Sequence, residues 1–304
     1  MISLSAIVSE RVRTQFNRMV QQTDYQQAYW YAISADFLAK DTIKRSYRSS
    51  STVNQSQAWA APEIEYDLHP GSVSGHITDK QACFNINTLT SSVDRSLSSP
   101  PFLADVFKRI VEMADLTRTV EAQIATLEYL DRSRAVNSPQ EIGDSYSKSR
   151  LPSSVVPMLM EASEIYAIQG ISRQTIPRLM NLVCALPASY WRLNVNTITS
   201  EQWPLLSALF YPYIGESTAR DILDNRPYSG WTSVDEFFLV DSISHIDKSL
   251  LKKVHKYLDV NSNFFELDAL VKVHKLQVRM QSLIYSEDRR DIRTVRFRLG
   301  EIHA

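Results

Sequence analysis

The first 61 residues of the chain contain neither glycine nor proline, and Pro62 is the first residue that would interrupt a helix. Within this stretch, apolar residues recur at the three- and four-residue steps of one helical face. They are Val12, Phe16, Met19, Val20, Ala28, Tyr29, Ile33 and Phe37. We therefore predict one helix from about Leu4 to Tyr47, roughly 65 Å long at 1.5 Å per residue. Helices of globular proteins average only about 11–12 residues, so the rest of the fold has to be arranged along an unusually long element.

After Ser49 the sequence changes to strand-like patterns, then to helical ones, and back. The segments "EIEYDL" and "GSVSGHITDKQACFNIN" predict a small antiparallel sheet, and helical periods follow from Phe102 to about His255. Strand patterns return in "FELDALVKV", "LQVRMQSLIY" and "RTVRFRL". We expect the two groups of strands to join in one sheet of an α+β fold, with the helical block inserted between them. The expected parts are residues 1–48 (helix), 49–90 (first part of the sheet), 91–256 (inserted helical domain) and 257–304 (second part of the sheet).

The composition is that of a soluble globular protein, and the sequence carries no motif for catalysis or phosphate binding. Hydrophobic residues make up 44% of the chain and charged residues 22%, as in folded domains. The seven glycines form no P-loop or G-x-G-x-x-G loop, and the six histidines form no H-E-x-x-H or H-x-H pair. There is no G-x-S-x-G sequence, and neither cysteine lies in an activating motif. We therefore predict that the chain is not an enzyme and requires no cofactor.

Residues 193–238 have the layout of a helix-hairpin-helix, a unit that other proteins use to hold DNA. An "NVNT" lead-in precedes a helix, a hairpin around Gly215, a second helix and an Arg226-Pro227 turn. A DNA-holding hairpin presents backbone amides through closely spaced glycines, flanked by lysine and arginine. This one has a single glycine, and residues 193–257 carry six basic and eight acidic side chains. We therefore expect no nucleic-acid partner and predict a packing unit of the helical block, with a helix-hairpin-helix DNA-binding protein as the alternative.

Two pairs of residues leave alternatives open. Cys83 and Cys184 are consistent with two buried thiols in a reducing compartment or with one disulfide in an oxidising compartment. Asp131 and Asp144 stand at the ends of a polar loop, and oxygen ligands of such a loop can hold calcium. Two arginines lie inside that loop and few acids are near, so a purely structural loop is the alternative.

Six segments occur in an order that is typical of one known family. They are "QQAYWYAISADFLAK", "DKQACFNINTL", "EASEIYAIQGIS", "LVCALPASYWRLNVNTIT", "ARDILDNRPYSGWTSVDEFF" and "YLDVNSNFFEL". Together, after a glycine-free helix and before a strand-rich end, they resemble the minor pseudopilin K of the type II secretion system (general secretion pathway protein K, GspK) over nearly the whole chain. The resemblance implies a type IV pilin-like fold, a long N-terminal helix packed on an antiparallel sheet, with a large helical domain inserted in the sheet.

The resemblance also implies a function without enzymatic activity. The family member is a minor pseudopilin at the tip of the pseudopilus, where it helps to start assembly and so supports protein export across the outer membrane. The implied partners are minor pseudopilins I and J, with the major pseudopilin, the secretin and secreted substrates as further contacts. Val12, Phe16 and Tyr29 are the residues that we expect to pack against partner helices. For the later residues of the helix, Ala28 to Leu38, packing against the protein's own sheet is an alternative of at least equal weight.

The implied location is the inner membrane, through a single N-terminal span, with the bulk of the chain in the periplasm. The opening "MISLSAIV" is shorter than the ~20 apolar residues of a membrane span, so we expect the membrane half of the helix to be missing from this numbering. A periplasmic location favours a disulfide between Cys83 and Cys184. We expect this disulfide to tie the sheet to the inserted domain.

The family sequence near Asp131 is associated with calcium. Asp131, Asp144 and Tyr146 match the family pattern, whereas Ser133 and Gly143 stand where the family has acids. Asp131 and Asp144 are therefore the candidate calcium ligands, and calcium is the one ion that the resemblance implies.

Overall fold

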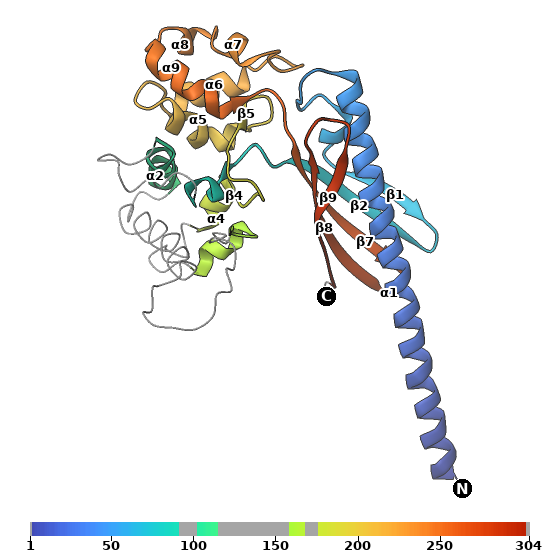
Figure 1. The fold of residues 1–304 in the computed structure, drawn as a ribbon. Helices are drawn as coiled ribbons and strands as arrows, with labels where there is room; N and C mark the ends of the chain where they lie inside the picture. The colour runs from blue at the N-terminus through green and yellow to red at the C-terminus, as the bar shows by residue number, and fades with distance from the viewer. Residues whose placement is uncertain (1, 91–101, 115–157, 168–175, 302–304) are drawn as a thin grey trace, which may run out of the picture. The chain divides into compact units, whose positions relative to one another are not determined.

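The computed structural model describes residues 2–90, 102–114, 158–167 and 176–301 of the chain (Figure 1). The chain divides into two units. We call the first, Met1–Asp79 with Asn261–Ala304, the sheet unit, and the second, Lys80–Val260, the helical unit.

The sheet unit consists of one long helix and a five-stranded antiparallel sheet. Helix α1 (Ile2–Ser49) confirms the prediction of a single long N-terminal helix, and a 3-10 turn, η1 (Ala58–Ala60), follows it. The strands are β1 (Ile64–Leu68), β2 (Gly71–Asp79), β7 (Phe264–Val273), β8 (Leu276–Ser286) and β9 (Ile292–Glu301). Their order is β1-β2-β7-β8-β9, with every neighbouring pair antiparallel. The two groups of strands meet where β2 pairs with β7, so the helical unit is inserted in the sheet, as predicted.

The second half of α1 packs on one face of the sheet because small residues repeat along one side of the helix. Ala28, Ala32 and Ala39 are at most 5% exposed, and their short side chains allow the helix to approach the strands closely. The strands present apolar residues to the helix at every second position, as expected for a sheet with one buried face. In β7 these are Phe265, Leu267, Ala269, Val271 and Val273.

A buried carboxylate fixes α1 along the sheet. Asp36 is 6% exposed and accepts hydrogen bonds from the hydroxyl groups of Ser282 on β8 and Thr294 on β9, with 2.8 Å between Thr294 Oγ1 and Asp36 Oδ2. Lys40, one turn further along α1, forms an ion pair with the same carboxylate at 2.7 Å. A buried charge is tolerated only when it is paired and hydrogen-bonded. A shift of the helix by one turn would break the hydrogen bonds of Asp36 with Ser282 and Thr294, whereas the ion pair with Lys40 would move with the helix, so the two hydroxyl contacts of Asp36 specify the register of α1 on the sheet.

The helical unit contains short helices and two small pairs of strands. The helices are α2 (Phe102–Ala114), α4 (Ile176–Met180), α5 (Trp203–Leu209), α6 (Glu216–Asp224), α7 (Val234–Phe237), α8 (Asp241–Ser244) and α9 (Lys248–Val254). The 3-10 turns are η2 (Ile86–Thr90), η3 (Ala162–Ala167), η4 (Ser200–Gln202) and η5 (His255–Tyr257). The strands are β3 (Phe84–Asn85), β4 (Val183–Cys184), β5 (Leu193–Asn194) and β6 (Leu258–Asp259). Strand β3 pairs with β4 and β5 with β6, both in parallel.

Strands β3 and β5 begin two copies of one sequence, "FNINTLT" and "LNVNTIT". In the first copy the side-chain amide of Asn87 binds the backbone of Leu159, accepting from its N–H at 2.8 Å and donating to its carbonyl at 2.9 Å. In the second copy Asn196 binds the backbone of Trp231 in the same way, at 2.8 Å and 2.9 Å. Both asparagines are fully buried. The helical unit therefore contains two copies of one short module, each with a parallel strand pair and an asparagine clamp.

The boundaries of the units differ from the expected parts 49–90 and 91–256. The helical unit begins at Lys80 and ends at Val260. The strand-like "CFNIN" pairs in parallel with β4 rather than joining the antiparallel sheet, and "YLD" pairs with β5 through β6. A short alternating segment predicts a strand but does not identify the strand with which it pairs. The helical unit therefore includes residues 80–90 and 257–260, which the sequence pattern assigns to the sheet.

Gly230 allows the chain to approach Asn196 closely, and we expect Gly230→Ala to lower the free energy of unfolding by about 1–3 kcal/mol. Its φ is +71°, and an added Cβ would lie 2.6 Å from Cγ of Asn196. Urea denaturation measures the loss. Gly215→Ala is the matched control, because an added Cβ there meets nothing within 4 Å, and it should change the free energy by less than about 1 kcal/mol. Equal losses in the two variants would contradict the role of the close approach.

Candidate functional site

The side of α1 that faces away from its own sheet carries a row of exposed apolar residues. We call this row the outer stripe; its members are 59–67% exposed. They are Val12, Phe16, Met19, Trp30 and Phe37. At about 100° per residue they fall within one narrow sector, opposite the alanines that pack on the sheet. Because large apolar side chains are costly to leave in water, the outer stripe is the strongest candidate contact surface in the sheet unit.

Two of the three residues predicted to contact partner helices lie in the outer stripe, and the third does not. Val12 and Phe16 belong to it. Tyr29 is 41% exposed, and its ring packs edge-on against Trp30 at 5.6 Å. Tyr29 lies about 100° around the helix from Val12, whereas Trp30 is aligned with Val12 after about five full turns. Trp30 therefore lies in the outer stripe and Tyr29 beside it, and contact with a partner remains a prediction for all of these residues.

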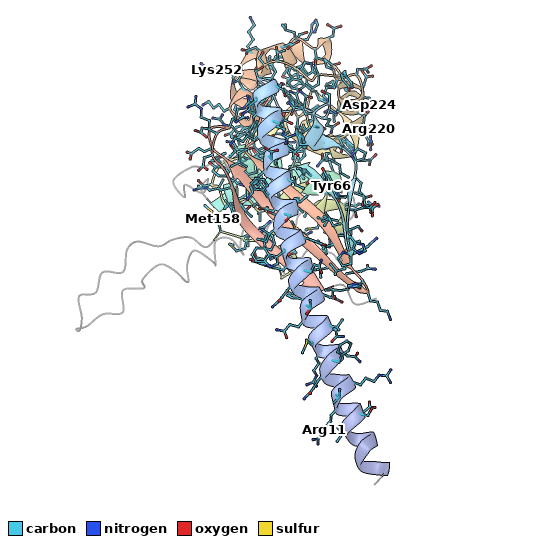
Figure 2. All side chains as sticks on the ribbon, turned by 90° about the vertical axis from the view of Figure 1, so that its right-hand side faces the viewer. Arg11, Tyr66, Met158, Arg220, Asp224 and Lys252 are labelled. Carbon is cyan, nitrogen blue, oxygen red and sulfur yellow. A yellow bond between two sulfur atoms is a disulfide. The ribbon has the colours of Figure 1, made fainter. Side chains whose placement is uncertain are left out.

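Basic residues flank the first half of the outer stripe. Arg11 and Arg18 lie on one side of it and Arg13 on the other, by the same helical spacing. All three are exposed, and Figure 2 shows Arg11 on the part of α1 that extends beyond the sheet. Glu10 is the one acid between Val8 and Gln22. The stripe is thus apolar at its centre and positively charged along its edges.

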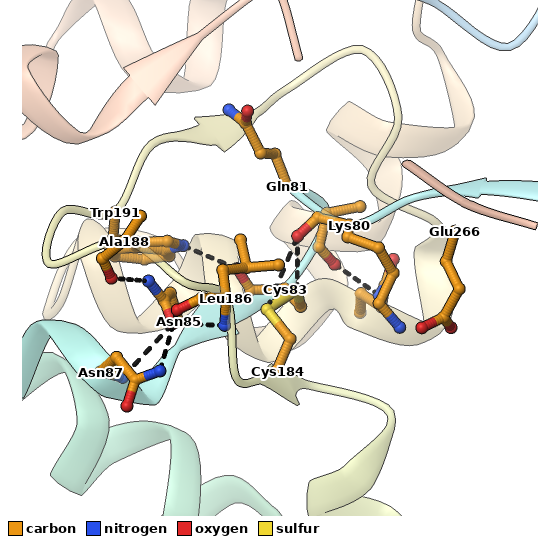
Figure 3. The surroundings of a disulfide bond; sticks show 12 residues. Lys80, Gln81, Cys83, Asn85, Asn87, Cys184, Leu186, Ala188, Trp191 and Glu266 are labelled. Carbon is orange, nitrogen blue, oxygen red and sulfur yellow. Dashed lines mark hydrogen bonds between the residues drawn. A yellow bond between two sulfur atoms is a disulfide. The ribbon is translucent and has the colours of Figure 1, made fainter. Parts of the chain in front are cut away.

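Cys83 and Cys184 form a disulfide, which confirms the predicted pairing (Figure 3). Their Cα atoms are 5.9 Å apart, because Cys184 lies in β4 and Cys83 directly precedes β3, which runs beside it. Nearby, Asn85 donates to the carbonyl of Ala188 at 2.7 Å, and the Trp191 indole donates to the carbonyl of Cys83 at 2.7 Å. Both cysteines belong to the helical unit. The expectation that the disulfide ties the sheet to the inserted domain is therefore wrong. The disulfide closes a loop within the inserted domain.

The helix-hairpin-helix segment is part of the core of the helical unit. Its apolar residues on α5, the hairpin and α6 are at most 3% exposed. They are Leu205, Leu206, Leu209, Ile214, Ala219 and Ile222. After the turn at Arg226, the rings of Trp231 and Phe237 lie 4.8 Å apart, centroid to centroid. The segment has the packing role that the sequence predicts.

The two arginines of the helix-hairpin-helix segment are engaged within the protein. Arg226 donates to the carbonyl of Ile198 at 2.7 Å, and burial lowers the pKa of its guanidinium group. Arg220 forms ion pairs with Glu216 at 3.0 Å and with Glu201 at 3.4 Å. A DNA-holding hairpin requires free positive charge for phosphates. The alternative of a DNA-binding protein has no support from these contacts.

Asp131 and Asp144, the candidate calcium ligands, lie outside the described residues. Within the parts of the chain that the structure describes, no group of three or more His, Cys, Asp or Glu side chains is placed to hold a metal ion. In the same parts, no helix combines the length and the apolar character needed to cross a membrane. Calcium binding at the two aspartates remains a prediction.

Comparison with known families gives a consistent result over both halves of the helical unit. Family models described as "Type II secretion system (T2SS), protein K" match residues 82–188 and 193–261. A crystal structure of the GspK-GspI-GspJ complex from the enterotoxigenic Escherichia coli type 2 secretion system contains a chain of the same fold. The TM-score is 0.78 at 27% sequence identity, over 94% of this chain and 100% of that one. The fold is therefore the predicted type IV pilin-like fold with an inserted helical domain.

Relatives of known family are similar over most of their length. The type II secretion system protein K of Pectobacterium carotovorum subsp. carotovorum is 28% identical over 293 residues, which cover 94% of this chain and 88% of the relative. The protein K of Aeromonas hydrophila is 26% identical, with 93% and 88% covered. The counterpart in Escherichia coli (strain K12) is 30% identical over 277 residues, with 88% and 83% covered. With this identity, coverage and shared fold, the chain belongs to the type II secretion system protein K family.

Proposed function

We propose that the chain is the minor pseudopilin at the tip of the type II secretion pseudopilus. In this role it assembles with minor pseudopilins I and J, helps to initiate the pseudopilus and so supports protein export across the outer membrane. Membership of the protein K family supports the proposal, as does the likeness to a chain crystallised in a GspK-GspI-GspJ complex. The observation that carries it is the outer stripe of α1, an exposed apolar surface suited to packing against other helices.

The spacing of the outer stripe is suited to a partner helix. Positions 12, 16, 19, 23, 26, 30, 33 and 37 follow alternating steps of four and three residues, the repeat of helices that pack side by side. Apart from Thr23 and Gln26 these positions are apolar. The stripe runs for about 38 Å along the helix, at 1.5 Å per residue. The arginines beside it favour partner helices that carry acidic residues on the corresponding flanks.

We also propose that the chain is held at the inner membrane through its N-terminal helix, with its bulk in the periplasm. The disulfide supports the periplasmic placement, because disulfides persist in oxidising compartments. Contacts with the major pseudopilin, the secretin and secreted substrates belong to the same proposal. In this proposal the chain acts in assembly of the pseudopilus, and its sheet and helical units provide the surfaces that bind the partner proteins.

Co-purification with minor pseudopilins I and J tests the proposal. The wild-type chain should elute with both, and Phe16→Ser combined with Trp30→Ser should weaken the complex by about tenfold or more, since two large side chains leave the interface. Gln21→Ser is the matched control, because Gln21 is exposed on the opposite side of the same part of α1. If the wild-type chain co-purifies with neither partner, the proposed function is refuted. Binding unchanged in the double variant would refute only the role of the stripe.

A further inference from the structure

The sheet unit contains an apolar groove that the packing of α1 does not fill. It encloses about 230 Å³ between α1, η1, β1 and β2. Small residues form its floor, including Ala35 of α1 and Gly75 of β2, while Leu38, Ile64 and Tyr66 stand at its rim. Gly75 is required there, since an added Cβ would lie 2.7 Å from the carbonyl oxygen of Asp268. The groove is therefore built into the backbone arrangement of the sheet.

One wall of the groove is β1, an edge strand. In the described part of the chain β1 pairs with β2 alone, so the hydrogen-bonding groups along its other edge face outward. Its inner side chains Ile64, Tyr66 and Leu68 line the groove, and Ile64 and Tyr66 are 39% and 46% exposed. Figure 2 shows Tyr66 on this strand beside α1. An edge strand with exposed apolar side chains is a template for the addition of a further strand.

The charge of β1 restricts what can be added. Glu65 and Asp67 alternate with the groove-lining residues and so project from the opposite face of the strand, and Glu63 precedes them. All three acids are exposed. A cluster of this kind attracts lysine and arginine and repels anionic lipid headgroups. The edge therefore favours a basic polypeptide over a membrane surface.

The size of the groove also limits its occupant. Small-molecule sites usually enclose about 300–1,000 Å³, more than is available here, whereas one or two large apolar side chains fit. We propose that the groove and the outer edge of β1 bind an extended segment of a partner protein, in which apolar residues alternate with lysine or arginine. The segment adds a sixth strand beside β1, its apolar side chains enter the groove, and its basic side chains meet the acids of β1. This surface borders the outer stripe on α1 but shares none of its residues, and the inference does not rest on the proposed function.

Fluorescence anisotropy with the full chain tests the inference. The probe is a labelled synthetic peptide of sequence Lys-Val-Lys-Phe-Lys-Val-Lys, and a peptide with glutamate in place of lysine is the control. We expect saturable binding of the basic peptide alone, with slower amide hydrogen exchange of residues 63–68 in its presence. Glu65→Lys combined with Asp67→Lys should weaken binding by about tenfold or more, through the loss of two attractive pairs and the gain of repulsion. The matched control is Asp224→Lys with Asp235→Lys, two exposed acids of the helical unit.

A second variant tests the groove itself. Ser34 is exposed at the rim, and Ser34→Trp should occupy the groove and abolish peptide binding. The inference would be overturned if the basic peptide did not bind the wild-type chain. It would also be overturned if the Glu65→Lys/Asp67→Lys variant or the Ser34→Trp variant bound the peptide as tightly as the wild-type chain. Self-association in sedimentation velocity that Ser34→Trp abolishes would instead assign the groove to a second copy of the chain. Flotation with phosphatidylglycerol vesicles that Ser34→Trp abolishes would assign it to lipid, and either result would overturn the inference.

Discussion

Replacing both Cys83 and Cys184 by serine is expected to lower the free energy of unfolding of the helical unit by about 4 kcal/mol. The disulfide joins residues separated by 101 positions. A cross-link over about 100 residues removes enough conformational freedom from the unfolded chain to stabilise the native state by roughly 4–5 kcal/mol in the chain-entropy account. Urea denaturation followed by tryptophan fluorescence measures the difference, because the Trp191 indole lies against the disulfide loop.

The control for this expectation uses a reducing agent. Dithiothreitol should shift the unfolding transition of the wild-type chain toward that of the double variant and leave the double variant unchanged. Mass spectrometry of the non-reduced wild-type chain should detect no free thiol. Two free thiols, or equal transitions for the two proteins, would show that the disulfide does not stabilise the helical unit.

Asn196→Ala is expected to lower the free energy of unfolding by about 2–4 kcal/mol. The side chain of Asn196 is the hydrogen-bond partner of both the N–H and the carbonyl of Trp231, a residue that is 4% exposed. Each buried backbone group left without a partner costs about 1–3 kcal/mol. Thermal unfolding followed by circular dichroism, together with urea denaturation, measures the loss.

Asn225→Ala provides the comparison for Asn196→Ala. Asn225 is exposed and bonds within its own helix turn, to Asp221, so its loss should change the free energy by less than about 0.5 kcal/mol. Because the module is repeated, Asn87→Ala should behave like Asn196→Ala. If Asn196→Ala is no more destabilised than Asn225→Ala, the clamp does not hold the module together.

The long helix and the insertion could be predicted because each has a local signal. Sixty-one residues without glycine or proline favour one helix, and alternating segments on both sides of a helical block indicate an inserted domain. The borders of the insertion could not be predicted in the same way. "CFNIN" alternates like a strand of the main sheet, yet its partner is the two-residue strand β4, about 100 residues further along the chain.

The residues of the outer stripe were predictable in part. Helical spacing identifies Val12 and Phe16, and the same rule, applied over five turns, favours Trp30 over Tyr29. The register of α1 had no local signal, because Asp36 resembles any polar residue of a surface helix and its partners Ser282 and Thr294 lie at the other end of the sequence. The repeat of the short module could have been predicted from the sequence, because a comparison of the chain with itself aligns "FNINTLT" with "LNVNTIT".

The pairing of β2 with β7 has a consequence for how such a chain could acquire its helical unit. Asp79, the last residue of β2, is opposite Phe265 near the start of β7, and its carboxylate accepts a hydrogen bond from Ser262. In the topology of the sheet, the segment from Lys80 to Val260 is therefore the connection between two neighbouring antiparallel strands. The entropic cost of closing a connection rises by only about 0.6 kcal/mol for each doubling of its length. The β2–β7 stem can accordingly carry a short turn or a whole domain at nearly the same entropic cost of closing the sheet.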